Sequence, residues 1–436
     1  MNSLMTQMKW AMVIGLTVTL CPAAQLEADG ASFQGLGDLP GGTFLSIARA
    51  TSADGAVVVG LSSSASGTEA FRWTSGGGMV GLGDLSGGAF LSRAFAVSAN
   101  GAVVVGNSNS AAGNEAFRWT SDGGIVGLGD LSGGAFSSQA YATSADGAIV
   151  AGDGKSALGD EAFRWTAAGG IVGLGDLPGS SFLSQARGMS ADGSVVVGRS
   201  ISAPGGVASF EAFRWTSAGG MIGLGDLPGG TFDSFAYAAS SDGAVVVGSS
   251  RSASGPEAFR WTAGGGMVGL GDLSGGAFNS VAYATSADGS VVVGCGNCGL
   301  APEAFIWDAV NGMRSLQDVL VNDFGLDLTG WELSHAYGIS ADGLTIVGRG
   351  DNPSGSNEAW IATLATPDSN LGDMDCSDAV DSGDMALFVE AVLDPAAFDA
   401  AHPDCDSSRA DVNGDSEVDG DDVQEFVACI LNAGCP

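Results

Sequence analysis

Basic residues are scarce in this chain of 436 residues. It holds 15 Lys and Arg against 49 Asp and Glu, so its formal net charge is −34. Only two of the basic residues are lysines, Lys9 and Lys155. A surface of this charge repels nucleic acid and anionic lipid, so we expect no nucleic-acid partner. It suits divalent cations instead.

Long apolar runs are also scarce. A transmembrane helix needs about 18 consecutive apolar residues, and no segment after the amino-terminal run supplies them. That run, residues 10–20, follows Lys9 and leads to the small residues Ala24 and Ala28. This layout is typical of a cleaved signal peptide. We therefore expect residues 1–28 to be a signal peptide and the mature protein to be secreted or at the cell surface, without a membrane span.

Histidine is rarer still, and the common catalytic motifs are missing. The two histidines, His335 and His402, have no recognisable motif around them. The sequence shows no nucleophile elbow, no His-rich metal motif and no phosphate-binding glycine loop. A pair of carboxylates brought together by the fold is the catalytic arrangement that remains open.

Repetition organises the long middle of the chain. The motif GLGDL begins at positions 35, 81, 127, 173, 223 and 269, and a degenerate copy, SLQDVL, begins at Ser315. The spacing is 46 residues except for one step of 50, which holds the insertion APGGVASF at 203–210. A fixed period of this length indicates an array of identical supersecondary units.

Each unit predicts four short antiparallel strands. One unit reads SRAFAVSA, a turn SANG, then AVVVG, EAFRWT and, after a glycine turn, IVGLGDL. The β-branched run fits a strand buried on both faces. The Asn-Gly or Asp-Gly pair is a strong hairpin signal because these residues accept positive φ. Four strands in about 46 residues are typical of a β-propeller blade, and a linear β-solenoid is the alternative.

The two ends of the array favour a closed ring. The last unit stops at EAWIATL and lacks its fourth strand, whereas a lone GLGDL stands at 35–39 before the first complete unit. A ring of seven units closes if residues 32–39 supply the missing strand, and closure removes two exposed sheet edges. We therefore predict an all-β, seven-bladed β-propeller over residues 30–364, closed by an N-terminal strand.

The motifs EAFRWT, LGDLPGG and SADG-x-VVVG resemble those of the HAF family of bacterial extracellular repeats. The resemblance covers about residues 35–364 and recurs in nearly every unit. It implies an exported repeat protein and brings no assigned activity.

Several large side chains recur at fixed positions of the units. In the first unit they are Glu69, Phe71, Arg72 and Trp73. Phe71 and Trp73 are two residues apart and so share one face of a strand. They could form an aromatic platform for sugars, but we favour packing between sheets because the repetition is so general. On that interpretation we expect Arg72 to be tethered to a carboxylate such as Asp38.

The loops between the second and third strands vary most from unit to unit. Strand alternation places them at the same end as the GDLPGG connections, and a polysaccharide or glycan bound by this face of the propeller would meet them. One such loop carries Cys295 and Cys298. In an exported protein we expect a local disulfide there, with a redox or metal role as the alternative.

The last 66 residues differ in composition and carry two calcium-loop motifs. From Leu371 onward there are 17 acidic residues and one arginine, Arg409, so residues 365–370 are the predicted linker to a domain at 371–436. DMDCSDAVDSGD and DVNGDSEVDGDD place oxygen ligands at positions 1, 3, 5, 7, 9 and 12 of EF-hand-type loops. The predicted ligands of two Ca²⁺ ions are Asp373, Asp375, Ser377, Ala379, Asp381 and Asp384, and Asp411, Asn413, Asp415, Glu417, Asp419 and Asp422.

A matching apolar stripe follows each loop and predicts two amphipathic helices. The stripes are Met385, Phe388, Val389, Val392 and Leu393, and Val423, Phe426, Val427, Ile430 and Leu431. Paired loops with Asp at position 12 and a helix directly after them resemble the small all-α type I dockerin domain. The resemblance implies calcium-dependent folding and docking onto a cohesin module, often in polysaccharide-degrading surface complexes.

Departures from the dockerin pattern refine these expectations. Ser377 replaces the usual Asp at position 5, so we expect the first loop to bind Ca²⁺ less tightly than the second. The four cysteines of this region allow three disulfide pairings, and the sequence leaves all three open. They are Cys376, Cys405, Cys429 and Cys435.

Two functions remain open from the sequence. The first is a secreted, non-catalytic binding or scaffold protein whose propeller is anchored to a cohesin-like partner through a Ca²⁺-dependent dockerin. The second is a carbohydrate-active enzyme, a glycoside hydrolase or lyase, with a carboxylate site in the propeller. We favour the first because little in the repeat is broken by unusual residues.

Overall fold

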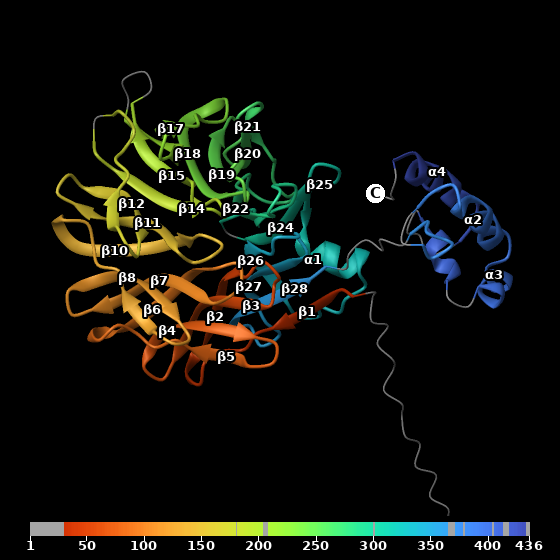
Figure 1. Cartoon of the computed structure of the whole chain (residues 1–436), viewed down its shortest axis with the longest axis horizontal. Coiled ribbons are helices and arrows are strands. Elements are labelled where there is room, and N and C mark those ends of the chain that lie inside the picture. Colours follow the sequence, from red (N-terminus) through yellow and green to blue (C-terminus); the bar gives the residue numbers. More distant parts are fainter. Residues whose placement is uncertain are drawn as a thin grey trace, which may run out of the picture.

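Figure 1 shows a computed structural model of the chain. The structure describes residues 30–179, 181–203, 208–299, 301–364, 371–377, 380–402, 405–412 and 418–432. The predicted signal peptide and the predicted linker at 365–370 lie outside these residues. About half of the chain lies in strands, so the fold is mostly β as predicted.

The described strands pair in successive antiparallel groups of four, and single parallel bridges join the first three groups into one sheet of twelve strands. The first three groups are β2 (Gly41–Thr51), β3 (Val57–Ser64), β4 (Gly67–Thr74) and β5 (Gly78–Gly81); β6 (Gly87–Val97), β7 (Val103–Ser110), β8 (Gly113–Thr120) and β9 (Gly124–Gly127); and β10 (Gly133–Thr143), β11 (Ile149–Ser156), β12 (Asp160–Thr166) and β13 (Gly170–Gly173). The next three are β14 (Ser184–Met189), β15 (Val195–Ser202), β16 (Ser209–Thr216) and β17 (Gly220–Gly223); β18 (Gly229–Ala239), β19 (Val245–Ser252), β20 (Pro256–Thr262) and β21 (Gly266–Gly269); and β22 (Val281–Thr285), β23 (Val292–Gly296), β24 (Glu303–Asp308) and β25 (Gly312–Ser315).

The last group contains the two ends of the repeat array. It holds β26 (Glu332–Ile339), β27 (Thr345–Asp351), β28 (Asn357–Thr363) and, from the start of the array, β1 (Ser32–Gly35). β1 pairs antiparallel with β28, with Phe33 opposite Ala362. The predicted closure by an N-terminal strand is therefore confirmed. The ring of Phe33 packs edge-on against Trp331, with centroids 5.0 Å apart.

The tight turns between the first two strands of each group are linked from group to group. The amide of Ala53 donates to the carbonyl of Ala99 at 3.0 Å, and the same bond recurs at each step. The last bond of the series runs from the amide of Ala341 back to the carbonyl of Ala53 at 2.9 Å. The sheets therefore form a closed ring (Figure 1), because an open solenoid could not make that last bond.

Glycine and asparagine have different roles in these turns. Gly55 and Gly101 adopt φ of 71° and 69°, a region that glycine enters without steric cost. Asn100 is not among the residues with positive φ, so the expectation that Asn also takes this conformation is wrong. Its side-chain oxygen instead accepts hydrogen bonds from the hydroxyl of Ser98 and the amide of Ala102.

The repeated aromatic residues pack between neighbouring sheets, as predicted. Phe71 is fully buried and lies in a cluster with Ala48, Val58 and Val347, which belong to the first and last groups. Trp73 belongs to the same cluster and is 5% exposed. The alternative of an exposed stacking platform is not what these side chains form.

The predicted tether of the repeated arginine is wrong. Arg72 donates through Nε to the carbonyl of Gly101, in the turn of the next group, at 3.3 Å. Equivalent bonds are made by Arg118, Arg164, Arg214 and Arg260. Asp38 lies instead near Glu358, and burial together with this like charge raises the pKa of Asp38. A backbone carbonyl takes the arginine because the turn, not the GLGDL loop, faces that end of the strand.

Short helices complete the structure. Two brief turns, α1 (Leu316–Asp318) and η2 (Val319–Asp323), stand where the degenerate SLQDVL motif departs from the repeat. The others lie in the helical segment, our name for residues 371–432. They are α2 (Asp384–Leu393), α3 (Pro395–Ala401), η3 (Ser407–Ala410), η4 (Gly420–Asp422) and α4 (Val423–Asn432).

The helical segment has its own small core. The rings of Phe388 in α2 and Phe426 in α4 stack with centroids 3.8 Å apart and planes 3° apart. These residues occupy matching positions after the two loops, so the halves of the segment meet at equivalent side chains. A disulfide joins Cys376 to Cys405, which selects one of the possible pairings for these two cysteines. Cys295 and Cys298 form the local disulfide that the sequence predicts.

Candidate functional site

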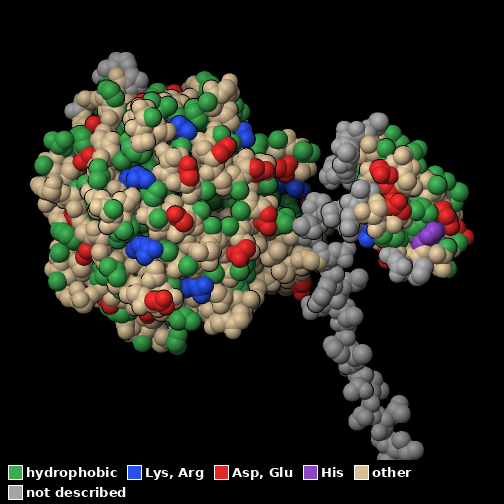
Figure 2. Space-filling model, in the orientation of Figure 1, with side chains coloured by type: hydrophobic (Ala, Val, Ile, Leu, Met, Phe, Trp, Pro, Cys, Tyr) green, Lys and Arg blue, Asp and Glu red, His purple; other side chains and the backbone are tan. Residues whose placement is uncertain are grey.

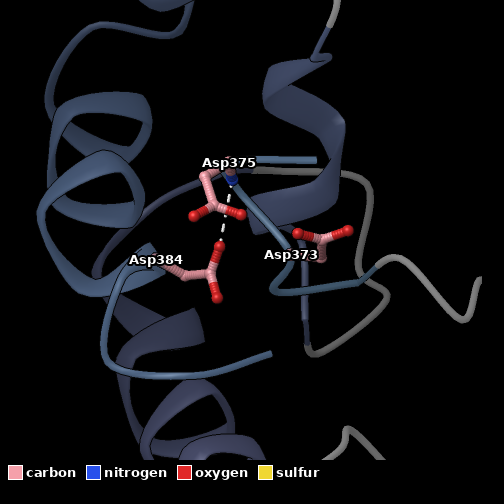
Figure 3. Close-up of side chains that lie close together, drawn as sticks. All are labelled: Asp373, Asp375 and Asp384. Carbon is pink, nitrogen blue, oxygen red and sulfur yellow. Dashed lines mark hydrogen bonds between the residues drawn. The ribbon is translucent and has the colours of Figure 1, made fainter. Parts of the chain in front are cut away.

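The first calcium-loop motif brings three carboxylates together at the start of α2. Oxygens of Asp373, Asp375 and Asp384 lie within 4.8 Å of one another. Figure 3 shows Asp375 and Asp384 facing each other, joined by a hydrogen bond from the Asp375 amide to the Asp384 carboxylate. Asp373 and Asp384 are fully buried, whereas Asp375 is exposed. Unneutralised charges this close and this buried repel one another strongly.

Backbone amides of the loop hold these carboxylates in place. Asp384 accepts from the amides of Met374 at 2.7 Å and Asp381 at 2.8 Å. Asp373 accepts from the amide of Ser377 at 3.0 Å. The chain therefore wraps around its own acidic side chains and aims them inward, which is how a loop of this spacing surrounds a cation.

The other predicted ligands of the first loop are placed as follows. Asp381 lies three residues before Asp384 in the sequence, and its carboxylate accepts a hydrogen bond from the amide of Gly383 at 2.6 Å. The amide of Ser377 bonds two of the three clustered carboxylates. Ala379 lies outside the described residues.

The second loop is described at its two ends. Asp422 is fully buried and accepts from the amide of Asp419 at 3.0 Å, as Asp384 does from Asp381 in the first loop. Asp411 begins the loop directly after η3. The predicted ligands Asn413, Asp415 and Glu417 lie outside the described residues.

Arg409 links the two halves of the helical segment. Its Nη1 lies 3.2 Å from a carboxylate oxygen of Asp373 and 3.0 Å from the carbonyl of the same residue. The carbonyl oxygen of Arg409 also accepts a hydrogen bond from the amide of Gly372 at 2.7 Å. This arginine offsets part of the negative charge at the edge of the first loop.

The donor set of the first loop fits a hard divalent cation. Calcium takes six to eight oxygen ligands from carboxylates, carbonyls and water, at 2.3–2.6 Å. Three carboxylates converge here, two of them removed from water, and the described residues bring no sulfur or imidazole ligand to the cluster. Oxygen-only ligation of this kind selects Ca²⁺ or Mg²⁺ over softer metals.

The predicted apolar stripes of the two helices are divided between core and surface. Phe388 and Phe426 face the core, with Val392 packed beside them. By contrast, Met385, Val389 and Leu393 on α2 are 51%, 53% and 79% exposed. Val423 and Val427 on α4 are 46% and 48% exposed. These five residues of the predicted stripes therefore face outward, while Asp384 and Ala391 join Phe388 on the inward face of α2.

Figure 2 shows how charge is distributed over the face that it draws. Basic and acidic side chains are scattered singly over the ring of sheets. Acidic side chains gather on the helical segment, whose basic content in the sequence is one arginine.

A cavity inside the ring was not predicted from the sequence. It has a volume of about 660 Å³, and arginine and tyrosine side chains from the first strands of the groups line it. The signal was present in the sequence: after an alanine that every group repeats, one position of this strand varies between Arg, Phe and Tyr. The sequence shows this position within an alternating pattern, but it does not show that these side chains point into the ring.

One of the two histidines, His335, contacts the wall of this cavity. Its ring stacks on that of Tyr337 with centroids 5.2 Å apart, and its Nδ1 lies 3.4 Å from Nε of Arg349. Burial and the nearby charges of Arg349 and Arg49 lower the pKa of His335 to about 4. The imidazole is therefore neutral at pH 7. The other histidine, His402, contacts Phe398 and Glu390 in the helical segment.

Comparisons with known proteins give weak structural similarities. No protein-family model matches the chain, and no curated protein matches its sequence. It is similar to TolB from Acinetobacter baumannii, with 15% identity and a TM-score of 0.40 over 60% of this chain and 64% of that one. It is also similar to an oligogalacturonate lyase in complex with manganese, with 12% identity and a TM-score of 0.47 over 78% and 95%.

A third similarity is to the β-propeller domain of the Trilobed protease from Pyrococcus furiosus. Identity is 9% and the TM-score is 0.45, over 74% of this chain and 98% of that one. The architecture of this chain is given by its own strand pairing, in groups of four antiparallel strands. Among the described residues, no helix has the length and apolar character that crossing a bilayer requires.

Proposed function

We propose that the protein is an exported, non-catalytic binding or scaffold protein in which a seven-bladed β-propeller is joined to a Ca²⁺-dependent docking module of the dockerin type. The observation that carries the proposal is the convergence of Asp373, Asp375 and Asp384 in a loop that leads directly into α2. The groups of four strands and their closed series of turn-to-turn bonds support seven blades.

In this proposal the two loops bind one Ca²⁺ each, and the ions supply folding energy rather than chemistry. Asp373, Asp375 and Asp384 hold the first ion, with Ser377, Asp381 and the carbonyl of Ala379 completing its shell. In the second loop Asp411, Asp419 and Asp422 act with Asn413, Asp415 and the carbonyl of Glu417. We expect the second site to be the tighter one.

The exposed apolar faces of α2 and α4 support docking to a protein partner. Five aliphatic or Met side chains at matching helical positions are about half exposed or more. Exposed apolar residues gathered on one small module are typical of an interaction site. We propose that a cohesin-like module covers this face, and that the protein acts at the cell surface in polysaccharide utilisation.

Calorimetric titration of the full chain with Ca²⁺ tests the metal part of the proposal. We expect two sites, with Asp422→Ala weakening the tighter one and Asp373→Ala the weaker one. Glu390→Ala, an exposed carboxylate of α2 outside the loops, is the matched control and should leave both sites intact. A wild-type chain that takes up no Ca²⁺ at millimolar concentration contradicts the assignment.

Titration with a cohesin module, with and without Ca²⁺, tests the partner. Val389→Asp should abolish binding while leaving Ca²⁺ uptake unchanged, because this side chain lies outside the carboxylate cluster. Leu158→Asp is the control, since Leu158 is 70% exposed on the ring. Binding that survives Val389→Asp would place the partner elsewhere.

The alternative function, a glycoside hydrolase or lyase, is favoured by one observation. Where α1 and η2 interrupt the repeat, a cavity of about 510 Å³ is lined by Glu303, Asp318, Glu332 and Asp351. Paired carboxylates are the usual catalytic groups of glycoside hydrolases. Release of reducing ends from a polysaccharide, lost in Glu332→Gln, would establish this function in place of simple binding.

A further inference from the structure

The first strand of each group places one large side chain at the same point around the ring. These side chains are Arg49, Phe95, Tyr141, Arg187, Tyr237, Tyr283 and Tyr337. All four tyrosines of the chain belong to this set. The residue before each of them is a fully buried alanine, which packs between sheets. Packing therefore fixes the strand, and the next side chain is free to differ.

Each of these side chains stands at a break in strand register. Ala48 pairs with Gly60 and Ala50 with Val59, so Arg49 is left over as a bulge. The same shift leaves Tyr283 between Ala282 and Ala284. A bulge redirects a side chain and often occurs beside a binding site. The bulges account for the inward direction of these residues, which line the cavity of about 660 Å³.

The close approach of the paired strand explains why this geometry is rigid. A Cβ added at Gly60 would lie 1.9 Å from the carbonyl oxygen of Ile47, so only glycine fits opposite the start of the bulge. The equivalent glycine of the last group, Gly348, has the same 1.9 Å approach to the carbonyl oxygen of His335. The inward side chains are therefore presented by a backbone that larger residues would displace.

Aromatic and guanidinium groups contact one another around the cavity. The guanidinium of Arg49 lies 4.3 Å from the ring centroid of Tyr337, and that of Arg187 lies 3.7 Å from the centroid of Tyr141. Tyr283 contacts Tyr237 at 5.4 Å and Tyr337 at 5.0 Å. The wall is therefore made of flat π faces with cations held against them.

The charge of the cavity is opposite to that of the protein. Its described lining includes Arg49, Arg93 and Arg187 and no carboxylate, in a chain of net charge −34. Arg187 is paired with Asp153 at 2.6 Å. Nε of Arg49 is buried and has no hydrogen-bond partner within the described part of the chain. A buried guanidinium nitrogen without an acceptor is costly, and an anion in the cavity would supply one.

The size of the cavity suits a small ligand. Leu45, Leu61 and Thr68 line the part away from the linked turns, near the loop that joins β3 to β4. The volume falls within the range of about 300–1,000 Å³ that is typical of small-molecule sites. This is the end of the ring where the loops between second and third strands vary most in sequence.

We propose that this cavity binds an acidic sugar of one or two rings, with its carboxylate on Arg49 and Arg93 and its ring faces against the tyrosines. Arginine forks bind carboxylates with two parallel hydrogen bonds. The tyrosine faces offer large, flat contact area for the apolar face of a pyranose ring, with hydroxyl groups at the rim. The proposal concerns the ring alone and stands independently of Ca²⁺ binding by the helical segment.

Isothermal titration of the full chain separates the parts of this proposal. The probes are digalacturonate, neutral galactobiose of the same linkage, and inorganic sulfate. We expect digalacturonate to bind at least about tenfold more tightly than either of the others, because each lacks one of the two interactions. Equal binding of galactobiose would overturn the role of the arginines, and equal binding of sulfate would overturn the role of the aromatic wall.

Variants locate the site. Arg93→Gln should weaken digalacturonate binding at least about tenfold, while Arg251→Gln, outside the cavity and about half exposed, should change nothing. Arg93→Lys, which keeps the charge but loses the fork, should give an intermediate affinity. Unchanged binding in a folded Arg93→Gln variant would contradict the proposal, and thermal melting of each variant establishes that it is folded.

The placement of all four tyrosines gives a reporter that needs no substitution. If the chain is labelled with 3-fluorotyrosine, every ¹⁹F signal comes from the cavity wall. We expect digalacturonate to shift these signals, whereas a tryptophan label should report little, because no described tryptophan lines the cavity. Shifts confined to the tryptophan label would place the ligand elsewhere and overturn the proposal.

Discussion

The ring and the helical segment are both acidic, but they treat their carboxylates differently. In the ring, each turn aspartate stands alone and receives hydrogen bonds from nearby hydroxyl and amide groups. The hydroxyl of Ser286 donates to Asp288 at 2.6 Å, and these bonds lower the pKa of Asp288 to about 2. In the helical segment, Asp373, Asp375 and Asp384 converge on one another instead.

This difference separates two ways of stabilising an acidic protein. The ring stabilises its turn aspartates by local hydrogen bonds and gains stability from repeated packing of buried Phe, Val and Ala side chains. The helical segment has one small core around Phe388 and Phe426 and a cluster of carboxylates that repel until a cation joins them. We expect only the second to depend on an ion.

The largest expected effect is the removal of calcium. A chelator should unfold the helical segment and leave the ring folded, because binding energy supplies folding energy in the segment alone. At a free Ca²⁺ concentration 1,000 times Kd, one site contributes about 4 kcal/mol. Calorimetry of the full chain should show one transition that moves with Ca²⁺ and one that does not. A single unfolding transition that chelator does not change would contradict the expectation that the helical segment alone depends on Ca²⁺.

The next largest effect concerns closure of the ring. Deleting residues 30–39 removes β1, exposes the edge of β28 and should cause both a lower melting temperature and self-association. The milder change Phe33→Ala should cost about 2 kcal/mol, since the partly buried ring of Phe33 packs on Trp331 and Trp360. Phe44→Ala is the matched control, because Phe44 is 42% exposed. A monomeric deletion variant with unchanged melting would mean that β1 does not close the ring.

A pH dependence in the ring should come from His335. Its pKa is about 4 in the folded protein and near 6.5 in the unfolded chain, so the unfolded state binds more protons between these values. The free energy of unfolding is therefore highest above pH 6.5, where His335 is neutral in both states. It falls as the pH drops toward 4, by up to about 3 kcal/mol. Urea unfolding of the ring at pH 7.5, 6 and 5 should show this loss in the wild type and in His402→Gln. His335→Gln should show a flatter profile, and an identical slope would exclude His335 as the source.

The smallest expected effect tests the arginine that links neighbouring groups. Arg118→Met should destabilise the ring by about 1 kcal/mol, because it removes one hydrogen bond to the carbonyl of Gly147. Arg251→Met should have almost no effect, since Arg251 makes only an exposed ion pair with Asp233. An equal loss of stability in the two variants would mean that the hydrogen bond from Arg118 to the next group does not stabilise the ring.

The repeat made much of the ring predictable. Period and alternation located the strands, and a unit count with an extra strand at the start and a missing strand at the end predicted the pairing of β1 with β28. The hydrogen-bond partners of polar side chains were harder to predict from the sequence. Arg72 reaches a carbonyl of the next group rather than a carboxylate, and that choice depends on how far adjacent sheets are rotated, which a sequence does not encode locally.

The cavity and the surface of the helices show a second limit. Alternation assigns Arg49 and Tyr283 to a face of a strand only while the register is regular, and bulges at these residues change the direction in which they point. Likewise, the stripe containing Met385 and Phe388 reads as one apolar face, but the inward position of Asp384 rotates Met385 outward. In both places a side chain of a proposed site departs from the regular pattern.

Closure by β1 also has a consequence for how the protein is made. Gly37, just after β1, bonds Glu358 across 321 residues of chain, so the strand synthesised first waits for the strand synthesised last. Contacts this distant in sequence form slowly, because the entropic cost of closing a long loop comes before the contacts can stabilise the chain. The ring should therefore assemble through a nearly complete arc whose two free edges persist until the end of β28 emerges. A chaperone present during folding would therefore bind the protein mainly in that arc-shaped state.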